Sequence, residues 1–348
     1  MTYRESDRER AMPPAATPRR GRLDHTFAAL DLGTNNCRLL IARAAPGGFR
    51  VVDAFSRIVR LGEGLTHSGR LSDEAIARTI GALKVCAGKL ARRNVTRSRA
   101  VATEACRRAA NCGDFIETVR AETGIDMEII STAEEARLAL SGCAPLLDRD
   151  NRFAMVFDIG GGSTELMWLG VEDDGATALI SWLSVPIGVV TLAERHGGIT
   201  IDDALFARMV EEFAAHLSGF EDRYHIRRHL SEHPVQLLGT SGTVTTLAGV
   251  HLGLPRYDRA QVDGIWLEAD QVAEVTDRLV RMQYRERAHH PCIGPDRADL
   301  VIAGCAILSA IQNTWPFQRL RVADRGVREG VLFDLMNDAD GELAAAGA

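Results

Sequence analysis

One arrangement occurs twice in the chain, and this duplication restricts the folds that the chain can adopt. The segment FAALDLGTNNCRLLIARA begins at Phe27, and FAMVFDIGGGSTELMWLG begins at Phe153. In each segment an apolar run ends close to an aspartate, a turn containing glycine follows, and a second apolar run begins. This pattern predicts two strands joined by a tight turn. A single repeat with so long a period indicates a duplicated domain and not a solenoid.

The residues after each copy extend the similarity. Further strands are predicted at 49–59, 98–103 and 126–130 in the first half, and near 177–185, 235–239 and 319–322 in the second. Helices are predicted at 72–93, 112–123 and 132–143, and then at 188–195, 202–219, 242–250, 268–282, 298–313 and 327–336. Both halves thus have the order βββαβαβα, which is that of the ribonuclease H-like fold. Two such domains resemble the actin, sugar-kinase and heat-shock-chaperone superfamily, an α/β class with its active-site cleft between the domains.

Length and composition agree with a two-domain protein. For 348 residues we expect a disordered tail at 1–25, a first domain at 26–136, and a second at 137–340 whose last helix could pack on the first. The net charge of -6 argues against a sequence-independent nucleic-acid binder. Seven cysteines without a C-x-x-C spacing argue against a disulfide framework or a zinc site. No apolar run suggests a membrane span or a signal peptide, so we expect a cytoplasmic protein.

Three turns that contain glycine are candidates for phosphate binding. Because Lys84 and Lys89 are the only lysines, an anion site here needs arginine, backbone N–H groups or a metal ion. The most specific candidate has three consecutive glycines. Each glycine lowers the stability of a strand or helix by roughly 0.5–1 kcal/mol relative to alanine, and close approach of the backbone to a ligand would explain why three are present. The alternative for each turn is an ordinary hairpin or strand–helix junction. The candidate residues are Gly33, Thr34 and Asn35; Gly160, Gly161, Gly162, Ser163 and Thr164; and Gly239, Ser241, Gly242 and Thr243.

Carboxylates near these turns suggest metal binding and base catalysis. Asp158 and Glu165 flank the triple-glycine turn and offer hard oxygen ligands to Mg²⁺ (or Mn²⁺), and Asp31 precedes the first turn. In STAEEAR, Ser131 or Thr132 caps a helix, and either Glu134 or Glu135 can close a capping box. The other glutamate is then available as a general base for water.

Several motifs in order resemble the exopolyphosphatase/guanosine pentaphosphate phosphatase family. They are FAALDLGTNNCRLLIAR, EIISTAEEARL, FDIGGGSTEL, LGTSGT and ADRGVREGVL, and the resemblance covers about residues 26–336. It implies Mg²⁺-dependent hydrolysis of a terminal phosphoanhydride, with Glu135 as the general base and Arg107 as a phosphate ligand. It places the metal and phosphate-turn carboxylates on Asp158 and Glu165. The chain ends soon after REGVL, so it resembles the short form without the C-terminal HD-type helical region, which puts long-chain processivity in doubt.

The resemblance implies inorganic polyphosphate, guanosine pentaphosphate or both as substrates, and a homodimer is possible. Two alternatives are a sugar- or acetate-type kinase on the same fold and a nucleotide-binding interaction protein of the actin or chaperone type. No nucleic-acid or membrane partner is expected. Two arginine groups stay open: Arg281, Arg285 and Arg287 could line a polyanion path, and Arg325 and Arg328 could bind phosphate or pair with Asp324 and Glu329.

Overall fold

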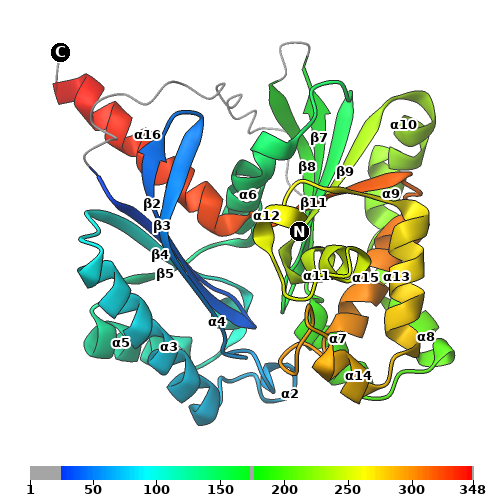
Figure 1. Ribbon diagram of the computed structural model, residues 1–348, viewed down its shortest axis with the longest axis horizontal. Helices are drawn as coiled ribbons and strands as arrows, with labels where there is room; N and C mark the ends of the chain where they lie inside the picture. Colours follow the sequence, from blue (N-terminus) through cyan, green and yellow to red (C-terminus); the bar gives the residue numbers. More distant parts are fainter. Residues whose placement is uncertain (1–24, 173–175, 347–348) are drawn as a thin grey trace. The chain divides into compact units, whose positions relative to one another are not determined.

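The computed structural model describes residues 25–172 and 176–346. The described chain forms two compact units (Figure 1). The N-terminal unit contains residues 25–143 and 326–346, and the central unit contains the described residues of 144–325. The tail expected at 1–25 lies, apart from His25, outside the described residues.

The N-terminal unit is built on a five-stranded sheet with the order β3-β2-β1-β4-β5. β1 (Phe27–Leu32), β2 (Asn36–Ala45) and β3 (Gly48–Ile58) are antiparallel neighbours. β4 (Arg97–Ala102) runs parallel to β1, and β5 (Met127–Ile129) runs parallel to β4. The predicted strand–turn–strand copy at the start of the chain is therefore present.

Helices cover both faces of this sheet because its strands are apolar on both sides. Ala28 and Leu30 pack toward α3 (Asp73–Arg92) and α5 (Cys112–Thr123). Phe27 and Ala29 pack toward α6 (Thr132–Cys143) and α16 (Val327–Ala346). Two short helices, α2 (Leu65–Ser68) and α4 (Glu104–Arg108), complete the unit.

The contact between α6 and α16 explains why the division of the chain differs from the expected one. A Cβ atom on Gly330 would lie 2.1 Å from the carbonyl oxygen of Leu138, and one on Gly142 would lie 2.0 Å from that of Gly326. The two helices therefore approach to backbone contact. A boundary after residue 136 would cut α6, which is continuous to Cys143, so the N-terminal unit extends further than expected. The last helix, α16, packs on this unit, as the sequence analysis allowed.

The central unit repeats the same strand order. Its sheet has the order β10-β11-β9-β6-β7-β8, in which β6 (Phe153–Ile159), β7 (Thr164–Val171) and β8 (Thr177–Val185) are antiparallel. β9 (Val235–Thr240) and β11 (Arg319–Ala323) are parallel to β6, and a short β10 (Trp266–Glu268) pairs with β11. Both sheets thus have the ribonuclease H-like order, as predicted, and β10 is an addition.

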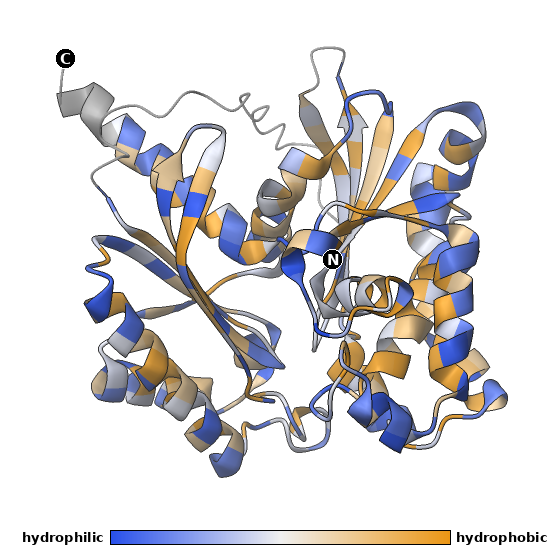
Figure 2. Cartoon of the chain, viewed as in Figure 1, coloured by the Kyte–Doolittle hydropathy of each residue, from blue (hydrophilic) through white to orange (hydrophobic). Residues whose placement is uncertain are grey.

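In the central unit, α15 (Val301–Thr314) is buried along most of its length and contacts the helices α7 (Val189–His196), α8 (Asp203–Ala214), α11 (Ser241–His251) and α13 (Ala269–Arg281). α13, in contrast, buries only Val272, Val275, Thr276 and Leu279, and Figure 2 shows its hydrophilic and hydrophobic sides. The helix predicted over 202–219 is interrupted: α8 ends at Ala214, and a separate helix, α9 (Ser218–Tyr224), begins near the end of the predicted range. None of the described helices is long and apolar enough to cross a membrane. The bounds are η1 (Ala144–Leu146), α7 (Val189–His196), α8 (Asp203–Ala214), α9 (Ser218–Tyr224), α10 (Ile226–Glu232), α11 (Ser241–His251), α12 (Arg259–Val262), α13 (Ala269–Arg281), α14 (Tyr284–His289) and α15 (Val301–Thr314).

Candidate active site

The turn between β1 and β2 is held by its carbonyl groups and leaves side-chain oxygens without partners. Gly33 N donates to Asn36 O at 2.9 Å, and Gly62 N donates to Thr34 O at 2.9 Å. Thr34 Oγ1 and Asn35 Oδ1 are buried and have no hydrogen-bond partner among the described residues. Buried polar atoms are usually paired, so unpaired atoms in one turn point to a ligand.

Asp31 lies at the start of the same turn, opposite Arg38 in the β1–β2 register. Burial raises the pKa of its carboxyl group, Arg38 and Arg328 offset part of this effect, and Glu329 adds to it. The carboxylate form therefore gains from any further positive charge that binds beside it.

Arg107 of α4 and Glu135 of α6 form an ion pair. Arg107 Nη2 donates to Glu135 Oε2 at 2.8 Å, and Nη1 donates to the carbonyl oxygen of Ile130 at 2.9 Å. Burial alone lowers the pKa of Arg107, but the carboxylates of Glu135 and Glu104 outweigh burial and raise it. The guanidinium and a candidate base thus lie together, with their side chains 16% and 14% exposed.

The neighbouring glutamate has a different role. Ser131 Oγ accepts a hydrogen bond from Glu134 N at 3.1 Å, as an N-cap does. The Glu134 carboxylate binds Arg99 at 2.9 Å and Arg137 at 2.8 Å. The sequence left open which of the two glutamates belongs to the helix cap. Glu134 lies at the cap and links α6 to Arg99 of β4, whereas Glu135 pairs with Arg107 of α4.

In the central unit, the triple-glycine turn is fixed through its carbonyl groups. Gly160 O accepts from Val189 N at 2.9 Å and Gly161 O from Val190 N at 2.8 Å, so both bind the start of α7. Among the described residues, no hydrogen bond engages the N–H groups of Gly161, Gly162 and Ser163. These donors are available to an anion. Thr164 Oγ1, by contrast, donates to Ile187 O at 2.8 Å and is fully buried.

Asp158 and Glu165 suit a hard cation. They are directly opposite in the β6–β7 register, so both side chains project from one face of the sheet. Glu165 is buried and accepts a hydrogen bond from Ser184 Oγ at 3.0 Å. No group of three His, Cys, Asp or Glu side chains that could hold a metal ion occurs among the described residues. Carboxylate oxygens are the donors that Mg²⁺ uses when water and substrate phosphate supply its other ligands.

The third turn lies at the same edge of this sheet, because Thr240 is in register with Asp158. Thr240 precedes α11 and donates through Oγ1 to Arg325 O. Ser241 has a φ of 79°, which is uncommon for a residue with a side chain. A Cβ atom on Gly239 would lie 2.3 Å from the Phe157 ring, whereas Gly242 is open. The N-terminal N–H groups of α11, at Gly242 and Thr243, favour an anion.

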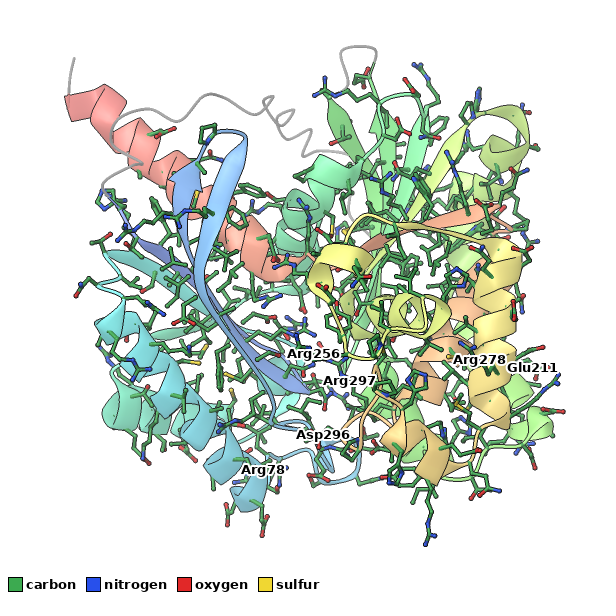
Figure 3. The ribbon with its side chains drawn as sticks, viewed as in Figure 1. Arg78, Glu211, Arg256, Arg278, Asp296 and Arg297 are labelled. Atoms are coloured by element: carbon green, nitrogen blue, oxygen red, sulfur yellow. The ribbon has the colours of Figure 1, made fainter. Side chains whose placement is uncertain are left out.

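Other basic residues have positions that the sequence did not reveal. Arg325 binds Asp263 at 2.7 Å, and Arg328 lies 3.9 Å from Glu329. Arg287 is buried and donates to Ile199 O at 2.6 Å, so it does not line a surface path for a polyanion. Arg297, labelled in Figure 3, approaches α11, where its Nη1 lies 3.4 Å from Thr246 Oγ1.

Known proteins resemble this chain over most of its length. Exopolyphosphatase 2 of Mycobacterium tuberculosis is 31% identical over 328 residues, which cover 88% of this chain and 98% of that protein. The crystal structure of an exopolyphosphatase from Cytophaga hutchinsonii has a TM-score of 0.81 at 25% identity and covers 90% of this chain and 98% of its own. The Aquifex aeolicus member of the Ppx/GppA family has a TM-score of 0.71 at 29% identity, with 90% and 98% covered.

These relatives confirm the resemblance seen in the motifs. The two sheets have the duplicated α/β order that the sequence predicts. A family model described as the Ppx/GppA phosphatase family matches residues 40–339. The chain therefore belongs to the Ppx/GppA phosphatase family.

Proposed function

We propose that this protein is an exopolyphosphatase that releases terminal orthophosphate from inorganic polyphosphate, from guanosine pentaphosphate, or from both. The 2.8 Å contact between Glu135 and Arg107 carries the proposal. It puts a carboxylate that can accept a proton next to a cation that can bind a phosphate oxygen. The name of the Mycobacterium tuberculosis relative, Exopolyphosphatase 2, supports this substrate class.

The reaction needs charge neutralisation because the anionic oxygens of a phosphoanhydride repel nucleophiles. Arg107, the side chains of Thr34 and Asn35, and the N–H groups of the triple-glycine turn and of the start of α11 bind phosphate oxygens, and none of these donors has to lose a proton. Asp158 and Glu165 would hold Mg²⁺ (or Mn²⁺), with Asp31 as a further carboxylate. When bound, the metal ion supplies positive charge to the phosphate oxygens.

Glu135 acts as the general base in this proposal. Its carboxylate takes a proton from water while the water oxygen bonds to the terminal phosphorus. The bond between that phosphorus and the bridging oxygen breaks, and the electron pair stays on the shortened chain. The products are orthophosphate and a substrate shorter by one phosphate.

The 5′-triphosphate end of guanosine pentaphosphate presents the same terminal phosphoanhydride, so the same groups can act on it. We further propose that the enzyme acts in the cytoplasm as a homodimer. Light scattering of the purified protein measures the second point, and a monomer throughout the concentration range contradicts it.

A substrate panel tests the proposed function. Orthophosphate release is measured with Mg²⁺ on polyphosphates of several lengths and on guanosine pentaphosphate, with ATP plus sugar or acetate acceptors in parallel. We expect orthophosphate from at least one of the first two substrates and no transfer from ATP. Transfer to an acceptor would identify a kinase instead, and nucleotide binding without turnover would indicate an interaction protein.

A further inference from the structure

Glu104 is a buried carboxylate that no motif points to. It is the first residue of α4, directly after Thr103, and is only 8% exposed. An acidic residue in the first turn of a helix is favourable, but a solvent-exposed one serves that purpose equally well. Because burying a carboxylate is costly unless it is paired, its location calls for a partner.

That partner is Arg107, one turn further along α4. Glu104 Oε2 accepts hydrogen bonds from Arg107 Nε at 3.2 Å and from Nη2 at 2.9 Å. With Glu135 on Nη2 and the Ile130 carbonyl on Nη1, groups within the described part of the chain engage four of the five N–H donors of the guanidinium. All three nitrogens are thus fixed by α4 and by the residues around the start of α6.

This arrangement sets the orientation of the guanidinium before substrate arrives. The donor left over is on Nη1, next to the bond to Ile130 O. A phosphate that binds there meets a guanidinium whose plane is already fixed, so little reorganisation is needed. The second carboxylate also reduces the net positive charge that a phosphate encounters, so Glu104 contributes orientation and not affinity.

We propose that Glu104 is a positioning residue, which holds the Arg107 guanidinium so that it can contact a substrate phosphate and Glu135 at the same time. This inference rests on the proposed hydrolysis. Without Glu104, Arg107 keeps its charge and can still attract phosphate, but its plane is free to turn. Misplacement of a catalytic group by about 1 Å can reduce the rate by roughly a hundredfold.

The variants Glu104→Ala and Glu104→Gln test the proposal on the full-length protein with polyphosphate. We expect Glu104→Ala to lower kcat by roughly tenfold to a hundredfold with KM unchanged or lower. Glu104→Gln keeps an acceptor oxygen for Nε and should recover part of the lost kcat. Glu122→Gln is the matched control, since Glu122 is an exposed carboxylate of the same unit, paired with Lys84.

Combination with Arg107→Ala separates positioning from a general loss of structure. If Glu104 acts through Arg107, adding Glu104→Ala to Arg107→Ala lowers kcat no further. An equal fold-loss in both backgrounds, or a higher KM with unchanged kcat, would overturn the inference. A wild-type protein that releases no orthophosphate would instead remove the proposed function. Thermal unfolding of each variant shows whether the assay contains folded protein, and Glu104→Gln replaces Glu104→Ala where the latter does not fold.

Discussion

Asp158 on β6 and Glu165 on β7 are directly opposite each other, one on each side of the triple-glycine turn. Their carboxylates therefore leave the same face of the sheet, beside N–H groups that have no protein partner among the described residues. Along the chain, the N–H donors of the turn thus lie between two carboxylates. Such a site suits a cation and a phosphate bound together better than either ligand alone.

Asp158→Asn is expected to raise the Mg²⁺ concentration needed for half-maximal activity by about tenfold or more, because an amide oxygen carries no full charge. A metal titration of orthophosphate release measures this shift. Asp277→Asn serves as the control, since Asp277 is an exposed partner of Arg281 in the same unit. An unchanged titration in Asp158→Asn would remove Asp158 from the metal site.

Glu135→Gln is expected to lower kcat by roughly a hundredfold to ten-thousandfold, the usual contribution of a general base, while polyphosphate still binds. Orthophosphate release and calorimetric binding measure the two effects. Glu134→Gln is the neighbouring control and should keep kcat within about threefold, because its carboxylate binds Arg99 and Arg137. Lost binding with unchanged turnover in Glu135→Gln would contradict the assignment of the base.

Gly330→Ala is expected to destabilise the protein by about 1–3 kcal/mol, since its Cβ would lie 2.1 Å from the backbone oxygen of Leu138. Urea unfolding measures the change. Gly81→Ala in α3, where no atom lies near the added Cβ, should raise stability by roughly 0.5–1 kcal/mol. If both substitutions stabilise, α6 and α16 do not approach as closely as described.

Asp53 is expected to make stability depend on acidic pH. Hydrogen bonds from Lys89 and Arg93 lower the pKa of its carboxyl group from 3.8 to about 2. A depressed pKa in the folded state stabilises the protein above the unfolded pKa, and this contribution is lost as pH falls from about 4 toward 2. Urea unfolding of wild type and Asp53→Asn at several pH values should show a difference that closes over this range. A gap of constant size would contradict the ion pair.

Local sequence patterns predicted much of the fold. The two strand–turn–strand copies were recognisable because apolar runs and glycines mark strands and turns within a few residues. The break between α8 and α9 was missed because residues 215–217 contain no glycine or proline, and α10 was not predicted. β10 is three residues long and too short for a period to show.

The candidate site, like the fold, has some features that the sequence predicts and others that it does not. The glycine turns could be predicted, because the glycines and the apolar runs beside them lie within a few residues of one another in the sequence. The distinct roles of Glu134 and Glu135 depend on Arg99 and Arg107, which come from another strand and helix. Glu104 gave no signal, because burial of a carboxylate is decided by the packing around it and not by its neighbours in sequence.

The discontinuous N-terminal unit has a consequence for biosynthesis. One face of its sheet, with Phe27, Ala29 and Leu40, is covered by Val331, Leu332 and Met336 of α16. A ribosome makes these strands first and α16 only after the whole central unit has emerged. Until then α6 covers this face without α16, and α6, which carries Glu135, meets its partner helix only after the whole central unit has been made.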